Sequence, residues 1–262
     1  MKMKVVSKVV ESRWQSEGRG ARVRRSIGRP ELRNLDPFLL LDEFEGSGAE
    51  GAGFPDHPHR GFETVSYLLE GEFTHEDFAG EDNTYYEDDL YYLKHCSGNR
   101  GVLRPGDLQW MTAGRGIVHS EMPGWERTRG LQLWVNLASE YKMVEPQYQE
   151  LTCDQIPVAE RDGARVKVIA GHSLGVSSEV RTRTPTYYLD ISLNPGSRHS
   201  QEVPEAWTTF VYILSGTLRF GDKVVEAHNT VLFTHEGEGV ELENSGSEPA
   251  HCVLIAGRPI RE

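Results

Sequence analysis

The sequence contains few cysteines and no long apolar run. Its three cysteines, Cys96, Cys153 and Cys252, are odd in number and widely separated in a chain of 262 residues. Such a set predicts neither a disulfide framework nor a thiolate metal site. No stretch approaches the length of a membrane-spanning helix, and Lys8 and Glu11 interrupt the N-terminal segment before the apolar part of a secretory signal could form. We therefore expect an intracellular protein without a membrane segment.

Positive charge is scarce as well. The chain has 28 Lys and Arg against 40 Asp and Glu, which gives a formal net charge of −12. Because non-specific nucleic-acid binding depends on cations that neutralise phosphates, this balance argues against direct binding of DNA or RNA.

Residues 1–33 depart from this balance. They hold ten Lys and Arg and only three Glu, a net charge of +7, which leaves −19 on the rest of the chain. Arg22, Arg24 and Arg25 belong to this basic segment. Two interpretations stay open: a solvated charged face, which we favour, or a surface that binds a partner or acts as a nuclear-import signal.

Helical periodicity is nearly absent, whereas strand signals are frequent. Apolar and polar side chains alternate at 131–137 and again at 187–193, which is typical of β-strands. Short strands of this kind are punctuated by 27 glycines and 13 prolines. The pattern predicts an all-β protein built as a duplicated small barrel or jelly roll.

A repeat within the chain supports the duplication. Residues 61–71 align without a gap with residues 206–216, at an offset of 145. Residues 108–116 align in the same way with residues 231–239, at an offset of 123. The sequence therefore predicts two copies of one fold.

The junction between the copies is expected in residues 141–160. This stretch is polar and mixed, and Pro146 and Pro157 interrupt it. Domain boundaries commonly fall in such segments. We therefore expect an N-terminal domain at 1–140 and a C-terminal domain at 141–262.

Two short motifs carry the clearest chemical signal. His57 and His59 are separated by one residue, as are His119 and Glu121. Side chains two residues apart in a strand point to the same face, and Pro58 favours extended geometry in the first motif. A single His-x-His motif is about as often a pair of surface residues as part of a metal site. Two such motifs inside glycine-bounded strands favour a metal site with three imidazoles and one carboxylate.

The repeat tests this hypothesis. At the two offsets, none of the four donors is repeated in the second copy, so we expect one metal ion per chain, bound in the N-terminal domain. His199, His228 and His235 lack paired spacing and are expected to be ordinary histidines. The residues that the offsets place at the four donor positions are Glu202, Pro204, Leu242 and Asn244.

Two runs resemble the pirin family closely. They are GFPDHPHRGFETV at 53–65 and GDLQWMTAGRGIVHSEMP at 106–123, and flanking runs at 20–28, 35–38 and 143–148 agree. The resemblance covers nearly the whole chain. It implies a bicupin, with two cupin β-barrels in tandem and one iron in the N-terminal barrel. Carried over, the iron ligands are His57, His59, His119 and Glu121.

The resemblance also implies two alternative functions. Pirin-like proteins include quercetin 2,3-dioxygenases, which open the ring of flavonols with O₂. Animal pirins are described as iron-dependent nuclear co-regulators that bind transcription factors such as NF-κB. The first implies a metal-dependent enzyme with a flavonol-like substrate, and the second a partner bound through the basic segment. In either case we expect a monomer of the nucleus and cytoplasm.

The chain departs from the family at two places. An atypical insert lies near 81–98, as Gly71 to Thr112 spans 41 positions whereas Gly216 to His235 spans 19. Three interpretations of this insert stay open: a tolerated surface loop, an unspliced exon-like insertion, or a partner-binding element. We favour the surface loop. Family members also continue beyond the counterpart of Glu262 with a tail that covers part of the N-terminal barrel.

The donor set limits the metal and its chemistry. Imidazole and carboxylate without thiolate suit Fe(II), Mn(II), Ni(II) or Cu(II), and a closed structural zinc site ranks lower. Four protein ligands leave two octahedral positions for substrate and for water or O₂. Glu63 lies at an even spacing from His59, which predicts the same strand face and a supporting contact to the ligands or the substrate. No catalytic residue beyond these is predicted.

Overall fold

The computed structural model describes residues 1–77, 94–95 and 98–262. Most of them lie in strands, and the only helices in these ranges are two short 3₁₀ helices, η1 (Gly48–Glu50) and η2 (Ser139–Tyr141). The predicted all-β class is confirmed. None of the described helices is long and apolar enough to cross a membrane. The insert predicted near 81–98 falls almost entirely outside the described residues, so its role stays a prediction.

The described chain divides into two compact units. We call Arg13–Arg29, Phe38–Gln155 and Glu262 the N-terminal barrel. We call Met1–Ser12, Pro30–Pro37 and Ile156–Arg261 the C-terminal barrel. The structure thus has the two predicted cupin-type barrels, but their boundaries differ from 1–140 and 141–262.

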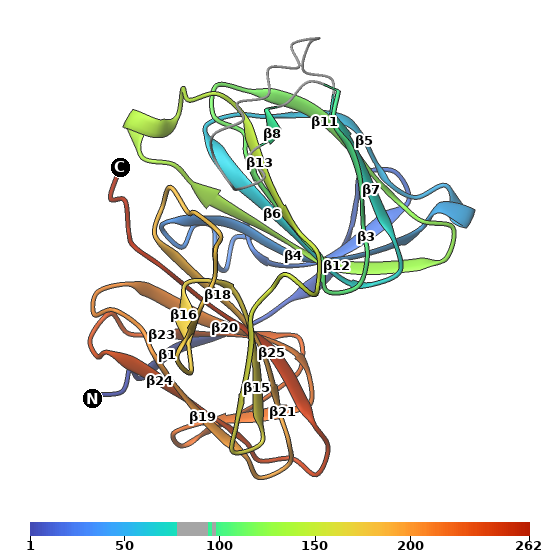
Figure 1. The fold of residues 1–262 in the computed structure, drawn as a ribbon. Coiled ribbons are helices and arrows are strands. Elements are labelled where there is room, and N and C mark those ends of the chain that lie inside the picture. Colours follow the sequence, from blue (N-terminus) through green and yellow to red (C-terminus); the bar gives the residue numbers. More distant parts are fainter. Residues whose placement is uncertain (78–93, 96–97) are drawn as a thin grey trace. The chain divides into compact units, whose positions relative to one another are not determined.

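Strand pairing explains the different boundaries. The N-terminal strand β1 (Val6–Glu11) pairs with β23 (Asn229–Phe233) of the C-terminal barrel (Figure 1). Strand β13 (Gln147–Leu151) lies inside the predicted junction segment 141–160 and pairs with β10 (Leu108–Thr112) of the N-terminal barrel, so the division falls later in that segment, after Gln155. Neither strand belongs to the aligned repeats: β1 is the edge strand of its sheet, and β13 lies between β10 and the short strand β8 (Lys94–His95).

The N-terminal barrel consists of a large sheet and a small sheet. The large sheet has the order β2 (Arg13–Glu17), β3 (Ala21–Ile27), β4 (Phe38–Ser47), β12 (Arg127–Asn136), β6 (Phe62–Glu70), β10, β13 and β8 (Lys94–His95). The small sheet has the order β5 (Phe54–His59), β11 (Ile117–Pro123), β7 (Phe73–Asp77) and β9 (Arg100–Leu103). All described pairings in both sheets are antiparallel.

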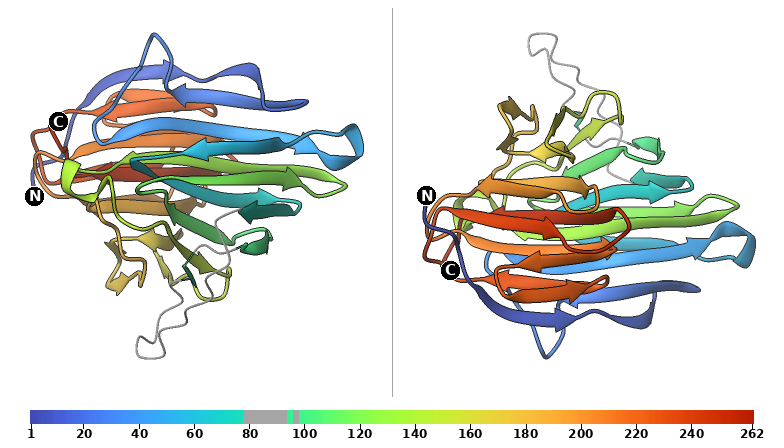
Figure 2. Two further views of the ribbon diagram at one scale, coloured as in Figure 1. Left: turned by 90° about the horizontal axis from the view of Figure 1, so that it is seen from above. Right: turned by 90° about the horizontal axis from the view of Figure 1, so that it is seen from below.

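The C-terminal barrel repeats this order. Its large sheet runs β14 (Val158–Arg161), β15 (Ala164–Ala170), β18 (Thr186–Leu193), β25 (Ala250–Gly257), β20 (Thr208–Ser215), β23 and β1. Its small sheet runs β19 (Arg198–Glu202), β24 (Gly239–Asn244), β21 (Thr217–Phe220) and β22 (Lys223–Glu226), and β16 (His172–Ser173) and β17 (Val176–Ser177) form a separate hairpin. Figure 2 shows the strands of the sheets running side by side. The predicted duplication is therefore visible in strand order.

An apolar layer fills one level of the N-terminal barrel. It consists of Val23, Phe44, Leu68, Phe73 and Leu103, with Phe54 packed against it. The Phe44 and Phe73 rings stack with centroids 4.7 Å apart. Gly130 of β12 lies in the same level, and a Cβ atom there would overlap the Phe44 ring and lie 2.9 Å from the Tyr67 carbonyl oxygen. The absence of a side chain at this position lets the phenyl ring enter the barrel.

A polar row lies next to this apolar layer. Its members are cross-strand partners on consecutive strands, two residues along each strand from the apolar level, so they face the same interior. They are Arg25 (β3), Asp42 (β4), Gln132 (β12), Ser66 (β6), Gln109 (β10) and Glu150 (β13). We call these six residues the polar row.

The C-terminal barrel has an apolar row at the same level. Val211 stands 145 residues beyond Ser66, and its partners across the sheet are Leu254, Leu189 and Val168. All four are fully buried. The barrel architecture therefore does not require polar side chains at this level.

Gly130→Ala should destabilise the protein by roughly 1–3 kcal/mol, because the added methyl group overpacks the apolar layer. Gly246→Ala is the control, since a Cβ there meets nothing closer than 3.4 Å. Urea denaturation followed by circular dichroism measures both. Adding Phe44→Leu to Gly130→Ala should recover part of the loss. Equal stability of the two single variants would show that the close approach of Phe44 is not a constraint.

Candidate metal centre

Antiparallel pairing of β5 with β11 brings the two predicted motifs together. His119 lies opposite His57, and Ile117 lies opposite His59. The intervening Pro58 is exposed, whereas one nitrogen from each of the three histidines lies within 4.8 Å of the others. These three histidines, which we call the histidine cluster, could hold a metal ion.

A bulge in β5 sets the orientation of His57. The register shifts between His119 and Glu121, opposite a segment that contains Pro55, which has no N–H to donate to the ladder. The Pro55 carbonyl oxygen lies 2.8 Å from His57 Nδ1. Because a carbonyl can only accept, Nδ1 is the donor, and in the neutral ring Nε2 is then the nitrogen with the free lone pair. That Nε2 lies 3.1 Å from His119 Nε2 and so faces the cluster.

Burial keeps two of the histidines neutral. His59 and His119 are 5% and 0% exposed. Loss of solvent, with the neighbouring imidazoles as a smaller cause, lowers the pKa of each ring to about 3. The buried Nε2 of His59 has no hydrogen-bond partner among the described residues. A buried nitrogen without a partner costs free energy, and a bound cation would satisfy its lone pair.

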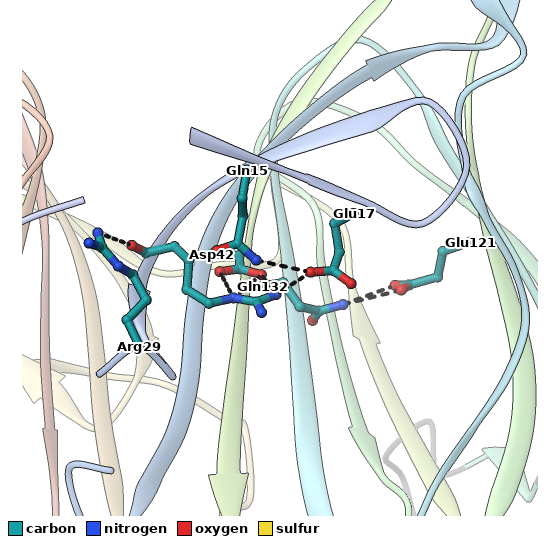
Figure 3. A network of polar contacts seen from close by, with 7 residues as sticks. Gln15, Glu17, Arg29, Asp42, Glu121 and Gln132 are labelled. Atoms are coloured by element: carbon teal, nitrogen blue, oxygen red, sulfur yellow. Dashed lines mark hydrogen bonds and ion pairs between the residues drawn. The ribbon is translucent and has the colours of Figure 1, made fainter. Parts of the chain in front are cut away.

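Glu121 lies beside the histidine cluster but is not a member of it. Its side chain is buried and raises the pKa of His59, against the larger effect of burial. The carboxylate accepts hydrogen bonds from Gln132 Nε2 at 3.3 and 3.2 Å (Figure 3). It also accepts one from Ser66 Oγ at 3.0 Å. Partners of this kind orient carboxylates that bind metals.

Glu63 is placed differently from the prediction. Strand β5 ends at His59 and β6 begins at Phe62, with Gly61 in the left-handed region at φ +78°. The turn breaks the alternation on which the prediction relied. Phe62 and Ser66 therefore face the barrel interior, and Glu63 lies on the other face, where it accepts a hydrogen bond from Thr112 Oγ1 at 2.7 Å.

A cavity of about 790 Å³ opens beside the histidine cluster. His57, His59 and Glu121 line it, and so do three members of the polar row, Arg25, Asp42 and Gln132. Its apolar wall includes five aromatic side chains, Phe44, Phe54, Phe62, Phe73 and Trp134. A large, mostly apolar cavity with a few convergent polar groups is typical of small-molecule sites.

Sequence reasoning missed most of this wall. The alternation at 131–137 was visible, but both faces of β12 are covered. Leu131, Leu133 and Val135 are fully buried on one face, while Gln132 and Trp134 line the cavity on the other. The alternation of apolar and polar residues shows which residues share a face of the strand, but it does not show which of the two faces lines a cavity.

The strand pairing aligns the two barrels directly. In the N-terminal barrel Phe73 of β7 pairs with Pro123 of β11. Leu218 of β21 takes the place of Phe73, because both lie two residues beyond the glycine that ends the repeated strand, and it pairs with Asn244 of β24. Asn244 therefore corresponds to Pro123 and not to Glu121.

The C-terminal counterparts of the four donors lack imidazole and carboxylate groups. Gln201 of β19 pairs with Val240 of β24, and the Val203 N–H binds the Glu238 carbonyl oxygen. For His57, His59, His119 and Glu121, in that order, the counterparts are Gln201, Val203, Val240 and Leu242.

The predicted counterparts Glu202, Pro204, Leu242 and Asn244 are thus wrong as an assignment. The loops that join β5 to β6 and β10 to β11 differ in length from their counterparts in the C-terminal barrel. The offset between equivalent residues therefore changes along the chain, and the two offsets of the aligned repeats do not apply to the donor positions. Within the described ranges, the histidine cluster is the only group of three or more potential ligand residues close enough to hold a metal ion.

The lowered pKa values predict acid sensitivity of the metal-free protein. Because the pKa values of His59 and His119 lie below the ordinary 6.5, the unfolded chain binds protons that the folded chain does not, so stability falls as the pH drops from about 6.5 toward 3. Between pH 7 and 5.5 each histidine should cost about 1 kcal/mol. Urea denaturation should show a smaller loss for His59→Asn/His119→Asn. An equal loss in that variant would contradict the buried, neutral state.

Comparison with known proteins identifies the family. The Pirin family model matches residues 20–98 and 92–135, and the Pirin C-terminal cupin domain model matches residues 188–262. Human Pirin is 56% identical over 265 residues, which cover 99% of this chain and 84% of the human protein.

Two solved structures share the fold over nearly the whole chain. The crystal structure of GK1651 from Geobacillus kaustophilus has a TM-score of 0.84 and 34% identity, and the match covers 100% of this chain and 99% of that one. Quercetin 2,3-dioxygenase from Acinetobacter baumannii has a TM-score of 0.84 and 30% identity over 99% of this chain and 88% of the other. With its two cupin barrels and a histidine cluster in one of them, this chain belongs to the pirin family.

Proposed function

We propose that this chain binds one Fe(II) ion in the N-terminal barrel and catalyses the O₂-dependent ring opening of a flavonol, as a quercetin 2,3-dioxygenase does. The observation that carries the proposal is the histidine cluster, with two buried neutral imidazoles, at the wall of an aromatic-lined cavity. The similarity to the Acinetobacter enzyme supports the same reaction class.

The proposed ligands are His57, His59, His119 and Glu121. One ring nitrogen of each histidine lies within 4.8 Å of the other two, and the Glu121 carboxylate accepts hydrogen bonds from two neutral side chains, Ser66 and Gln132. This set of nitrogen and oxygen donors fits iron, although other divalent transition metals accept the same donors. When bound, the metal lowers the pKa of a coordinating hydroxyl and brings the substrate and O₂ together.

The protein's own residues fix the ligands and exclude water. Phe62 and Trp134 pack together at 4.7 Å between ring centroids, and each ring lies 5.2 Å from the His59 ring. This aromatic contact holds His59 against the cavity wall. Gln132 and Ser66 each donate a hydrogen bond to the Glu121 carboxylate and hold it in place. A planar aromatic substrate would fill the cavity and displace the remaining water.

Iron-reconstituted protein should consume quercetin in air, and loss of the flavonol absorbance measures the rate. His57→Ala should lower turnover at least about a hundredfold, since the loss of an outer partner of a metal ligand already costs about 10–100-fold in affinity or activity and the loss of the ligand itself costs more. Turnover that is independent of the metal, or no turnover at all, would contradict the proposed activity.

Elemental analysis should give one metal ion per chain. His119→Ala should reduce the metal content sharply, because the cluster loses a buried donor. His199→Ala and His235→Ala should leave it unchanged, as these residues lie in the C-terminal barrel, whose interior lacks the donor set. A ratio near two, or metal retained after loss of both His57 and His119, would show that the site is assigned to the wrong residues.

We propose as a second candidate function that the chain is a monomeric, iron-dependent co-regulator of the nucleus and cytoplasm that binds a transcription factor. A surface contact favours it: the guanidinium groups of Arg22 and Arg24 lie 4.8 and 4.4 Å from the Trp14 ring centroid, which makes a basic and aromatic patch on β2 and β3. Arg25, which belongs to the same basic segment, faces the cavity instead.

This second candidate is tested by capture of nuclear transcription factors such as NF-κB on immobilised ferrous and ferric protein. Stronger capture by one iron state, and its loss in Arg22→Ala/Arg24→Ala, would support the co-regulator function. Equal capture by both states, with no effect of the double variant, would remove its basis.

A further inference from the structure

One wall of the cavity is polar, and the charges on this wall determine which kinds of ligand the cavity favours. Four carboxylates line the cavity, whereas Arg25 is its only cationic side chain, and every one of these residues is described by the structure. Even without Glu121, whose charge a bound metal would offset, three carboxylates and one guanidinium line the cavity, so this wall disfavours anionic groups placed against it and favours groups that donate hydrogen bonds. The four carboxylates belong to Glu17, Asp42, Asp56 and Glu121.

Asp42 is a carboxylate of this wall that is firmly held. Its side chain is 6% exposed, and Arg25 Nε and Nη2 donate to its two oxygens at 2.9 and 2.7 Å. Glu17 binds the same Arg25 Nη2 from the other side at 2.8 Å. Figure 3 shows Asp42 and Gln132 on neighbouring strands, with Glu121 beyond Gln132. The pair is therefore rigid, and Asp42 keeps acceptor lone pairs that Arg25 does not use.

A purely structural role for the pair is the competing explanation. Buried ion pairs are weak evidence for stability, because desolvation offsets the attraction. At the corresponding positions of the C-terminal barrel, Val168 replaces Arg25 and Leu189 replaces Asp42, and both are fully buried. The same barrel thus packs without the ion pair where there is no histidine cluster, which links the pair to the cavity.

We propose that Asp42, held by Arg25, determines ligand specificity: it accepts a hydrogen bond from a phenolic hydroxyl on an outer ring of the ligand, apart from the group that reaches the histidine cluster. A site that binds a hydroxyl with a buried carboxylate discriminates strongly against analogues without it, because the acceptor is then left unpaired. The inference rests on the proposed function for its probe, a flavonol.

The test compares two flavonols on the iron-loaded protein under nitrogen, with binding measured by fluorescence quenching. Quercetin carries hydroxyls on both outer rings, whereas 3-hydroxyflavone keeps only the central one. The wild-type protein should bind quercetin at least about tenfold more tightly. In Arg25→Met/Asp42→Leu, which makes these two positions apolar as they are in the C-terminal row, quercetin affinity should fall about tenfold or more, while 3-hydroxyflavone affinity should change less than about threefold.

The matched control is Glu43→Leu/Arg129→Met. Arg129 Nε binds Glu43 Oε1 at 2.6 Å, Glu43 is 3% exposed, and neither residue lines the cavity, because they lie on the opposite face of β4 and β12. This variant should keep the wild-type preference for quercetin. Thermal melting and metal content, measured on all variants, show that each is folded and loaded.

The outcomes separate the inference from the proposed function. If quercetin is turned over but the double variant keeps the preference, the inference is wrong and the function stands. If the preference disappears in the double variant but the wild-type protein shows no turnover, the function is wrong and the inference stands. If neither flavonol binds the wild-type protein, or if the control variant loses the preference equally, the inference is overturned.

Discussion

The antiparallel pairing of β5 with β11 is the constraint on which the site depends. It sets His119 opposite His57, and strand alternation then turns His59 to the same interior. The same pairing removes His59 and His119 from solvent, and burial keeps both neutral, as a ligand must be. Pro55 completes the arrangement, because its carbonyl oxygen fixes the tautomer of His57. The strand pair sets the positions of the three imidazoles, and burial in the barrel keeps two of them neutral.

The duplication shows which parts of this architecture serve function. Both barrels share the strand order, so hydrogen-bonded topology alone does not create a site. The difference lies in the interior: the row that contains Arg25, Asp42 and Gln132 in one barrel is aliphatic in the other. Filling a barrel with an aliphatic row costs less free energy, because buried polar groups lose their hydration and must be paired with one another. Arg25, Asp42 and Gln132 are therefore part of the cavity wall, and the barrel fold does not require them.

The sequence predicted the class, the duplication and the residues that form the histidine cluster, because each depends on short-range periodicity or spacing. It did not predict that the N-terminal strand β1 pairs with β23 of the C-terminal barrel, because the aligned repeats do not include β1. It placed Glu63 on the wrong face because a glycine turn interrupted the alternation. It missed Asp42 and Gln132 because strands buried on both faces do not mark which face lines a cavity, which only the register across several strands determines.

Anomalous diffraction at the iron edge from crystals of the iron-loaded protein tests the central claim most directly. The account predicts one strong peak per chain, bounded by the nitrogens of His57, His59 and His119 and by the Glu121 carboxylate, and no peak within the C-terminal barrel. A peak at other side chains, or a second peak of similar height in the C-terminal barrel, would contradict it.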